Sequence, residues 1–344
     1  MKKIIIATDN WYPEVNGIVR MVTNLSDLLQ KKDFAVTIIH PGLFYTLPLG
    51  FYSGVRISMF ADRKIKKILE IQMPDYIHIA TEGPVGLAVR TFCIKKGLKF
   101  TTSHQTKVPS YAEYYTKLKN NLVFNSLYAY FQWFHQKSSA VMVATESLRQ
   151  ELEKHGFKNL VLCPLGVNGD YFKRNLNSKV KESYKLKSPV FVYFGRIAKE
   201  KNIEEFLRCN LPGTKLIIGD GPIRKQLEKK YKDATFIGWK NNHELIDWLS
   251  ASDVFVFPSI TETFGLVILE ALSCGVPVAA HNVMGPKDII TQGIDGFLDE
   301  NLQKAALECL NFSREKCRQK ALQFSWDNAG KSFIKNLVRN EKNN

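Results

Sequence analysis

Short hydrophobic runs alternate with amphipathic stretches along the whole chain, a pattern that predicts parallel α/β architecture. In the first half, the runs predict strands at residues 3–8, 35–40, 76–80, 100–103 and 140–144, with helices at 17–31 and after Pro84. In the second half, they predict strands at 190–194, 215–218, 235–237, 254–257 and 276–279, and helices at 203–208, 223–231, 242–251 and 265–273. Each series is typical of one doubly wound parallel sheet.

The length of the chain, 344 residues, is too great for one ordinary hydrophobic core, so we expect two domains. The polar, lysine-rich region 168–187 predicts a linker or a surface excursion. The expected domains are therefore residues 1–165 and 166–325, followed by a C-terminal segment at 326–344. Open α/β sheets bind ligands at the carboxyl ends of their strands, so two facing domains would share one cleft.

Charge and cysteine content narrow the class of partner. The net charge of +15 allows nucleic acid, an anionic membrane surface or a phosphate-bearing substrate, although a lysine-rich compositional bias would produce the same excess. The basic residues form no single-strand platform and no helix-turn-helix, which disfavours nucleic acid. Six cysteines without a CxxC spacing favour a reducing cytosol and no metal site. We expect no signal peptide and no membrane-spanning helix, so any membrane contact is from the surface.

The most specific chemistry lies at residues 258–275, where Glu262 and Glu270 are separated by seven residues. A buried strand precedes this stretch and a helix follows, so Glu262 is expected on the turn and Glu270 about two helical turns further along. The turn also brings backbone N–H groups to a helix N-terminus, which suits a phosphate; they belong to Thr263, Phe264, Gly265 and Leu266. Two carboxylates and such a cradle would together hold a nucleotide-sugar.

A basic pattern follows the first strand of the second half. Gly195 and Arg196 come directly after that strand, and Lys201 lies five residues beyond the arginine. A glycine turn with two cations would clamp a diphosphate. The alternative is a basic loop closed by a structural ion pair to Glu200.

Three glycines and one histidine are further candidates. Gly219 and Gly221 end a predicted strand and would let a nucleobase or ribose approach the backbone, although a tight turn explains them equally well. Gly17 opens a helix that could face a phosphate or sugar, or could simply be a helix start capped by Asn16. His104 follows a predicted strand and is a candidate hydrogen-bond donor or proton carrier, although a lone histidine is usually structural.

Residues 111–137 contain nine aromatic side chains flanked by lysines. They predict either an interfacial segment at the headgroup level of a membrane, helped by the basic run 63–67, or an aromatic helix face packed in the core. The candidates for acceptor or membrane contact are Tyr111, Tyr115, Lys117, Lys119 and Trp133.

Taken together, these motifs resemble those of the retaining glycosyltransferases of family 4, which have the GT-B fold of two facing Rossmann-like, doubly wound parallel-sheet domains. The resemblance rests on the E-x7-E stretch with Thr-Phe-Gly, on Gly-Arg at 195–196 with Glu-Lys at 200–201, on Gly-Asp-Gly-Pro at 219–222 and on Pro-x-x-Asn-Gly at 13–17. The Ser-His-x-Thr run from residue 103 resembles the histidine motif of the branch that includes sulfoquinovosyl-, mannosyl- and glucosyltransferases acting on diacylglycerol or related lipids. The Leu-Pro-Gly-Thr-Lys-Leu run from residue 211 and the Ser-Trp pair at 325–326 are similar to short bacterial members that attach glucose or glucuronic acid to diacylglycerol.

The resemblance implies a role for each donor-side residue. Arg196 and Lys201 would neutralise the diphosphate of the donor, and Glu270 would bind the ribose hydroxyls. Glu262, with the amides of residues 263–266, would hold the transferred sugar. The N-terminal domain would supply the other two proposed groups, Gly17 and His104.

In that domain, Gly17 would close onto the phosphates and His104 would contact the sugar near its reacting face. The segment from Trp326 would cross back as a helix onto the first domain. Two cations and a helix dipole would replace a metal ion, and the resemblance implies no other cofactor.

The expected reaction moves a hexose, with glucose or glucuronic acid favoured, from a UDP-sugar to a lipid such as diacylglycerol, with retention of configuration. The enzyme would be cytoplasmic and peripheral on the inner face of the plasma membrane. The alternatives are a GDP-mannose-dependent mannosyltransferase, or an enzyme of the polysaccharide or lipopolysaccharide type with a soluble or other lipid-linked acceptor. Outside this activity, the alternatives are a phosphorylase or epimerase of the same fold, or a nucleic-acid-binding or scaffold protein.

Overall fold

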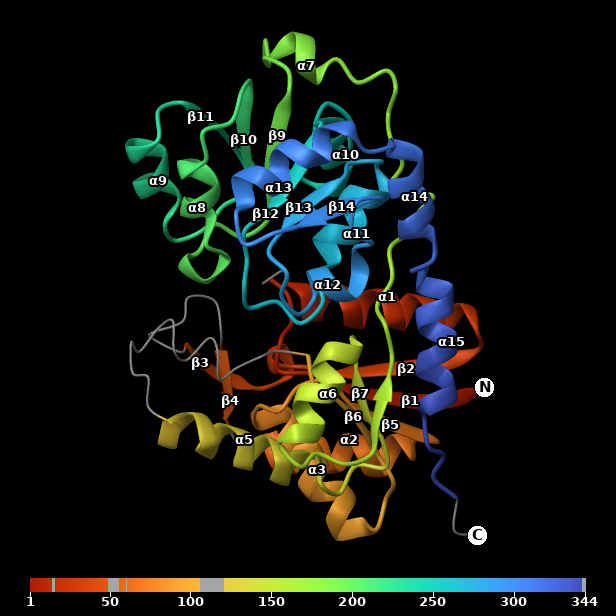
Figure 1. The fold of residues 1–344 in the computed structure, drawn as a ribbon. Helices are drawn as coiled ribbons and strands as arrows, with labels where there is room; N and C mark the ends of the chain where they lie inside the picture. The colour runs from red at the N-terminus through yellow and green to blue at the C-terminus, as the bar shows by residue number, and fades with distance from the viewer. Residues whose placement is uncertain (14–15, 49–55, 60, 106–120, 342–344) are drawn as a thin grey trace. The chain divides into compact units, whose positions relative to one another are not determined.

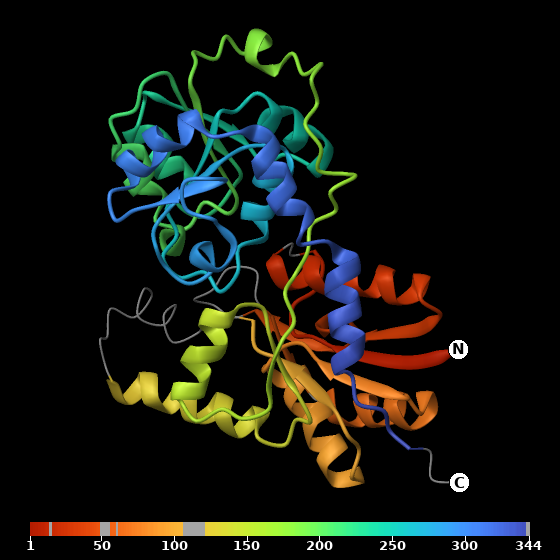
Figure 2. The same cartoon turned by 45° about the vertical axis from the view of Figure 1, so that its right-hand side comes forward.

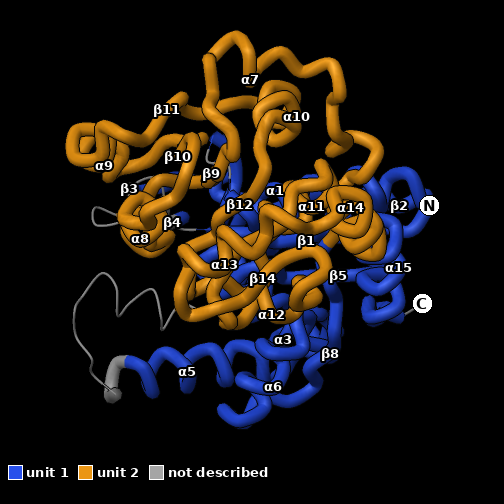
Figure 3. Tube along the Cα trace, turned by 45° about the horizontal axis from the view of Figure 1, so that its top comes forward, with its two compact units in different colours: residues 1–109, 119–165, 326–344 blue, residues 110–118, 166–325 orange. Residues whose placement is uncertain are grey.

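The computed structural model describes residues 1–13, 16–48, 56–59, 61–105 and 121–341 of the chain. These residues fall into two compact units, which Figure 3 shows in different colours. Unit 1 contains residues 1–105, 121–165 and 326–341, with the gaps just given, and unit 2 contains residues 166–325. No helix among the described residues is long and apolar enough to cross a membrane.

A parallel six-stranded sheet forms the centre of unit 1, in the order β2-β1-β5-β6-β7-β8 (Figure 1). Ile4, Ile5 and Ile6 of the first strand are all buried, as expected of a strand covered on both faces. The fourth strand in this order differs, because it is a buried run of hydroxyl-bearing residues. The strands are β1 (Lys2–Ala7), β2 (Phe34–Ile39), β5 (Tyr76–Ile79), β6 (Thr101–Ser103), β7 (Val141–Val143) and β8 (Leu160–Leu162).

Helices cover both faces of the unit 1 sheet (Figure 2). They are α1 (Gly17–Lys31), α2 (Ala61–Gln72), α3 (Pro84–Lys96), α5 (Asn121–His135), α6 (Glu146–Lys154) and α15 (Trp326–Asn336). Strands β3 (Tyr45–Pro48) and β4 (Arg56–Met59) form a separate antiparallel pair. The core beneath α2, α3 and α5 includes Ile65, Val85 and Phe134, so apolar faces of three helices bury one side of the sheet.

The C-terminal helix α15 packs against α1 within unit 1. The two helices approach closely because Gly330 has no side chain: a Cβ at this position would lie 2.2 Å from a methyl carbon of Leu28. Phe333 of the same helix is buried and its ring meets the edge of His78 in β5. The last helix of the chain is therefore part of the core of the first unit.

Unit 2 is built on a second six-stranded parallel sheet, in the order β11-β10-β9-β12-β13-β14. Its central strands are entirely buried hydrophobic runs, as expected where helices cover both faces. The strands are β9 (Val190–Phe194), β10 (Thr214–Ile218), β11 (Ala234–Gly238), β12 (Val254–Phe257), β13 (Val278–Ala280) and β14 (Gly296–Leu298).

The helices of unit 2 are mostly short. They are α7 (Val180–Ser183), α8 (Ile203–Arg208), α9 (Arg224–Lys230), α10 (Asn242–Ser250), α11 (Leu266–Ser273), α12 (Pro286–Ile289), α13 (Leu302–Glu308) and α14 (Arg314–Leu322), with 3-10 turns η2 (Lys199–Lys201) and η3 (Cys309–Asn311). Asn241 begins α10 with a capping box, in which its side chain and that of Glu244 satisfy each other's backbone N–H groups.

The predicted fold class, two doubly wound parallel-sheet halves, is confirmed. The strand predicted at 276–279 begins instead at Val278, because Pro277 before it cannot donate a hydrogen bond to the sheet. The short strands β8 and β14 were not predicted. All six cysteines are buried thiols.

Candidate functional site

In unit 2, the predicted donor-binding residues follow the carboxyl ends of three neighbouring strands (Figure 1). Gly195 and Arg196 follow β9 directly, Gly219 follows β10, and Glu262 lies in the loop between β12 and α11. Because β10, β9 and β12 are adjacent in the sheet, these loops leave it at the same edge.

An ion pair joins two of the predicted catalytic groups of these loops. The ammonium group of Lys201 donates a hydrogen bond to Oε1 of Glu262, and neither side chain is more than a fifth exposed. The structure therefore brings Lys201 to Glu262, whereas the sequence alternative paired the loop with Glu200. The Glu200 side chain is buried, and its backbone carbonyl accepts a hydrogen bond from Thr261 at 3.4 Å, which ties the two loops together.

Three residues that the sequence analysis missed hold the Lys201 turn in place. Asn202 has a φ of +52°, a left-handed conformation that asparagine tolerates, and it ends the turn. Its amide donates to the carbonyl of Pro258 at 3.3 Å and to the carboxylate of Glu205. Glu205 in turn lies 3.0 Å from Nε2 of His281, beyond the end of β13. The turn is thus linked to the ends of two other strands.

The start of α11 is shaped by glycine. Gly265 has a φ of +95° and precedes the first residue of the helix, Leu266. Phe264 is buried, and a Cβ on Gly285 would lie 2.9 Å from the Phe264 carbonyl oxygen, so Gly285 lets its own loop pack on this turn. Thr263 is buried as well. Sequence analysis missed Gly285 because no motif pointed to it.

Glu270 lies in the second turn of α11 and is buried. A buried carboxylate raises the cost of any further charge nearby. Burial, with the charge of Glu270 adding to it, raises the pKa of Cys274 to about 12. This cysteine is therefore a neutral thiol at physiological pH.

Gly219 and Gly221 have a packing reason for being glycine. A Cβ on Gly219 would lie 1.9 Å from the carbonyl oxygen of Gly195, and one on Gly221 would lie 2.2 Å from that of Ile197. The backbones are held there by hydrogen bonds such as that from Ile197 to the carbonyl of Asp220, at 2.8 Å. The chain itself thus requires both glycines, as the tight-turn alternative predicted, and a role in nucleotide binding is additional.

In unit 1, His104 follows β6 and is buried. Its Nδ1 lies 2.6 Å from Oε1 of Glu82, which follows β5. The same oxygen lies 3.1 Å from Nε2 of His135, the last residue of α5. Sequence analysis proposed His104 but missed Glu82 and His135, because the three belong to segments far apart in the chain.

Opposing effects act on the pKa of Glu82. Burial by itself would raise it, but the electrostatic interaction with His104 and the hydrogen bonds from both histidines together outweigh burial and hold the pKa at about 2. Burial lowers the pKa of His135 below its usual range, although Glu82 acts in the opposite direction. Glu82 is therefore an ionised acceptor at neutral pH.

The ligand atoms of Glu82, His104 and His135 all lie within 4.8 Å of one another, close enough to consider a metal ion. The two contacts to Glu82, at 2.6 and 3.1 Å, have the lengths of N–H···O hydrogen bonds. Ligands around a zinc ion at about 2.0–2.1 Å would be spread to about 3.3 Å from one another. The cluster is better described as a hydrogen-bonded network.

A third buried histidine lies beside this network. His78 in β5 has Thr101 Oγ1 3.0 Å from its Nδ1 and Ser103 Oγ 3.0 Å from its Nε2. Burial lowers the pKa of His78 to about 3. The hydroxyl residues of β6 thus serve to satisfy buried imidazoles.

The start of α1 has the cap that the sequence alternative predicted. Asn16 accepts hydrogen bonds from the backbone N–H groups of Ile18 and Val19, both at 3.0 Å. Gly17 is exposed, and no described atom lies within 4 Å of a Cβ built on it. Nothing in the described fold therefore requires a glycine at position 17.

In the described part of the aromatic segment, α5, some aromatic side chains pack in the core and others are exposed. Phe131 and Phe134 are buried in the core, whereas Tyr130 and Trp133 are exposed. The guanidinium of Arg90 lies 4.0 Å from the centre of the Trp133 ring and holds it in place. Four further candidates lie outside the described residues: Tyr111, Tyr115, Lys117 and Lys119.

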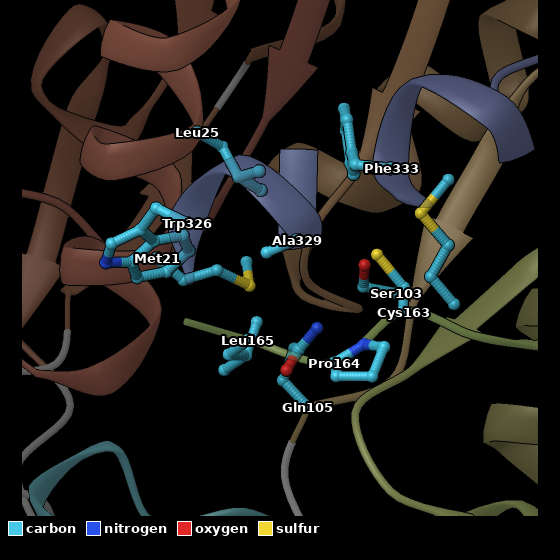
Figure 4. Close-up of a pocket in the computed structure, with 11 residues that line it drawn as sticks. Met21, Leu25, Ser103, Gln105, Cys163, Pro164, Leu165, Trp326, Ala329 and Phe333 are labelled. Carbon is cyan, nitrogen blue, oxygen red and sulfur yellow. The ribbon is translucent and has the colours of Figure 1, made fainter. Parts of the chain in front are cut away.

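An internal cavity of about 10 Å³ lies in unit 1 under α1 and α15 (Figure 4). It is too small for a sugar or a lipid chain and has room for about one water molecule. Its lining is mostly apolar and includes Met21, Leu25, Cys163, Trp326 and Phe333.

Comparison with known proteins gives two family matches. Residues 15–171 match the family described as Glycosyltransferase Family 4, and residues 175–310 match the family described as glycosyl transferases group 1. The two matches together cover most of the described residues of both units.

Individual relatives are distant but cover most of the chain. A GDP-mannose-dependent alpha-mannosyltransferase of Mycobacterium tuberculosis is 24% identical over 321 residues, covering 86% of this chain and 83% of the relative. An alpha-monoglucosyldiacylglycerol synthase of Streptococcus pneumoniae is 26% identical over 374 aligned residues, covering 96% of this chain and 84% of the relative. A solved structure, sucrose-phosphate synthase from Thermosynechococcus elongatus, has a TM-score of 0.76 at 18% identity and covers 97% of this chain and 98% of its own. At that identity, the shared feature is the fold.

Proposed function

Because the chain belongs to family 4 of the glycosyltransferases, with the GT-B fold, we propose that it transfers a hexose from a nucleoside-diphosphate sugar to a lipid hydroxyl. The observation that carries the proposal is the pairing of Lys201 with Glu262 on the loop that leads into α11. A cation, a carboxylate and a helix N-terminus on neighbouring loops are the groups that a diphosphate-linked sugar requires.

Unit 2 is the proposed donor-binding unit. Arg196 and Lys201 neutralise the diphosphate, and the backbone N–H groups of residues 263–266 donate hydrogen bonds to its oxygens. Glu262 accepts hydrogen bonds from the hydroxyls of the transferred sugar, and Glu270 accepts those of the ribose. The remaining donor-side residues are Gly195, Gly219 and Gly221.

Donor binding changes the partner of Lys201 in this proposal. A diphosphate and the Glu262 carboxylate compete for the same ammonium group, and the diphosphate carries the greater charge. As Lys201 turns to the phosphate, Glu262 becomes available to the sugar hydroxyls. Before the donor binds, Lys201 and Glu262 thus neutralise each other. The diphosphate then takes the place of Glu262 as the partner of Lys201.

The bond that breaks joins the anomeric carbon of the sugar to a diphosphate oxygen, and the new bond joins that carbon to the acceptor oxygen, whose proton passes to the leaving diphosphate. Negative charge grows on the leaving diphosphate in the transition state. Arg196, Lys201 and the N-terminus of α11 stabilise this charge, and fixed electrostatics of this kind is usually the largest catalytic contribution. Attack from the face that the diphosphate leaves retains the configuration and needs no covalent intermediate.

Unit 1 contributes Gly17 and His104 to the proposed reaction. Support for Gly17 is that the described fold has no need of a glycine there, so space for a ligand explains it. Its position at the start of α1 suits the phosphates of the donor. His104 would contact the sugar through the ring edge that faces away from Glu82.

The proposed acceptor is a lipid such as diacylglycerol, met at the inner face of the plasma membrane. Support comes from the Streptococcus pneumoniae relative, which is named a glucosyldiacylglycerol synthase, and from the net charge of +15, which favours an anionic surface. The exposed Trp133 is the described side chain best suited to the headgroup level.

The test is a screen of donors against acceptors with purified protein. UDP-glucose, UDP-glucuronate, UDP-galactose and GDP-mannose are each offered with diacylglycerol in mixed micelles, with and without a metal chelator, and lipid products are read by mass. A hexosyl- or hexuronosyl-diacylglycerol from a UDP-sugar, unaffected by the chelator, is the expected result. Donor hydrolysis without a lipid product would keep the transferase activity but indicate that the acceptor is a soluble glycan and not a lipid. No turnover of any donor would contradict the proposal.

A second candidate is a mannosyltransferase that uses GDP-mannose. The observation in its favour is the Mycobacterium tuberculosis relative, which is named for that donor and covers a comparable share of the chain. The same screen separates the two functions, since product from GDP-mannose alone would favour the second.

A further inference from the structure

We infer that Glu82 is the residue that positions His104, by fixing which ring nitrogen carries the proton and which edge of the ring meets the substrate. This inference rests on the proposed function, in which His104 contacts the transferred sugar. Glu82 itself touches no substrate, so it acts only through the histidine.

The geometry at Glu82 determines the tautomer of His104. An ionised carboxylate can only accept hydrogen bonds, so the contact of 2.6 Å places the proton on Nδ1 of His104. The other ring nitrogen, Nε2, then carries the lone pair and points away from Glu82. A histidine with one nitrogen tied to a carboxylate and the lone pair fixed on the other has a single defined chemistry toward a ligand.

The histidine ring is also held by its neighbours. Phe131 meets its edge with ring centres 5.3 Å apart, and His135 does so at 5.5 Å. Phe157 packs at 6.1 Å from a third direction. These contacts restrict the tilt of the ring, but only the hydrogen bond to Glu82 distinguishes the two ring flips.

The backbone around Glu82 is itself fixed, which a positioning role requires. Its carbonyl oxygen accepts a hydrogen bond from the hydroxyl of Tyr130 at 2.7 Å. The residue before it, Thr81, donates its hydroxyl to Asp9 at 2.8 Å, and Asp9 also accepts from the backbone N–H of Val85 at the start of α3. The residue after it, Gly83, lies so close that a Cβ would be 2.5 Å from the Asp9 carboxyl carbon.

A second imidazole, that of His135, also contacts the Glu82 carboxylate. His135 Nε2 lies 3.1 Å from the oxygen that His104 contacts, and its Nδ1 lies 2.8 Å from Thr102 Oγ1 in β6. Both histidines are buried, and their contacts with the carboxylate favour its ionised form. The network joins β5, β6 and α5 around a single oxygen atom.

The test compares Glu82→Gln with a matched Glu→Gln control in the same unit. Glu151 in α6 accepts a hydrogen bond from Tyr128 at 2.7 Å and has no place in the proposed site, so Glu151→Gln controls for loss of a partly buried, hydrogen-bonded carboxylate. The first readout is long-range proton–nitrogen correlation in protein labelled at histidine, which identifies the tautomer of His104 without any substrate. Wild type and Glu151→Gln should show the Nδ1–H form alone.

In Glu82→Gln, the amide can donate or accept, so a mixture of tautomers is expected. The kcat for sugar transfer should fall about 10- to 100-fold, as for other residues that orient a functional histidine, while KM for the donor changes less than threefold. Glu151→Gln should keep kcat within twofold of wild type. If wild type carries the proton on Nε2, or if Glu82→Gln keeps both the tautomer and kcat of wild type, the inference is wrong.

A double variant separates positioning from mere structural support. Glu82→Gln added to His104→Ala should cost no further activity if Glu82 acts through the histidine, whereas a structural role would make the two losses multiply. If His104→Ala alone keeps full activity, the proposed role of His104 fails, and the tautomer spectrum still decides whether Glu82 fixes the ring. The two failures are therefore distinguishable.

Discussion

At the carboxyl end of its sheet, unit 2 holds its candidate chemistry with glycine turns and an ion pair, whereas unit 1 holds its own in a buried network of imidazoles, hydroxyls and one carboxylate. In unit 2, Lys201 meets Glu262 across adjacent loops, and the loop of Lys201 also touches the loop after β10, through Gly195 and Gly219. In unit 1, His104 is one of several polar side chains packed around Glu82.

The difference reflects what each unit is proposed to do. A diphosphate is a fixed double charge, and fixed N–H groups and cations bind it well from loops. A sugar near its reacting carbon needs a neutral, directional contact, and a buried imidazole with a defined tautomer supplies one. The two sheets thus have the same architecture, but the loops at the carboxyl ends of their strands position charged groups in unit 2 and a buried imidazole in unit 1.

The largest expected effect is on kcat in Lys201→Ala. Removing a cation that faces the leaving diphosphate should lower kcat about 100- to 1000-fold, equivalent to about 2.7–4 kcal/mol of transition-state stabilisation. Steady-state kinetics with the best donor of the screen measures it, and circular dichroism checks that the fold survives.

Lys199→Ala is the matched control, because Lys199 lies in the same 3-10 turn and is exposed. It should keep kcat within twofold of wild type. Activity of Lys201→Ala within threefold of wild type would show that the Lys201–Glu262 pair only stabilises unit 2.

The second prediction contrasts two glycines. Gly219→Ala places a Cβ against the Gly195 carbonyl at a φ of +141°, so unit 2 should lose about 3 kcal/mol or more of stability. Gly17→Ala meets no described atom, so stability should stay within about 0.5 kcal/mol of wild type. Transfer activity of Gly17→Ala should nevertheless fall about tenfold if the phosphates approach this position.

Urea denaturation gives the stability of each variant, and initial rates give the activity. A Gly17→Ala variant with full activity would remove Gly17 from the donor site. A stable Gly219→Ala variant with lost activity would show that Gly219 is needed for nucleotide binding and not for packing of the chain.

The same contrast explains what could be predicted from the sequence. Lys201 and Glu262 were predicted because each lies a short, fixed distance from a hydrophobic strand, so periodicity alone gave their place in the fold. Glu82 and His135 carry no such signal: they meet His104 only because β5, β6 and α5 pack together.

For two glycines the sequence left two explanations open. Gly219 and Gly221 were predicted either to admit a nucleotide or to form a tight turn, and contacts with the backbones of Gly195 and Ile197 already require them. The pattern marks where a glycine lies and not what approaches it. Conversely, Gly285 packs against the turn before α11 without belonging to any recognised motif.

The third prediction concerns pH and the buried histidines of unit 1. The pKa of His78 is about 3 in the folded protein, below the 6.5 of an exposed histidine, because burial disfavours the charged ring. The unfolded chain therefore binds more protons, so stability is complete above pH 6.5 and is lost as the pH falls toward 3. From pH 7 to pH 5, the loss from His78 should be about 2 kcal/mol.

Urea denaturation at pH 7 and pH 5 measures this loss. In His78→Gln, the pH dependence should become weaker by the same amount, with a remainder from His135, whose pKa burial also lowers. A His78→Gln variant with the pH dependence of wild type would show that His78 is protonated, or solvated, in the native state.

The smallest expected effect, on membrane contact, tests whether unit 1 differs from unit 2 in its surface as well as in its site. Trp133 is 47% exposed on α5, and Trp239 is 67% exposed after β11 in unit 2, so the chain offers a matched pair. If α5 faces lipid, Trp133→Ala should lower partitioning into anionic vesicles several-fold, since interfacial binding grows with buried apolar area. Trp239→Ala should leave it unchanged. Flotation with vesicles rich in phosphatidylglycerol measures both, and equal losses in the two variants would attribute binding to net charge and not to α5.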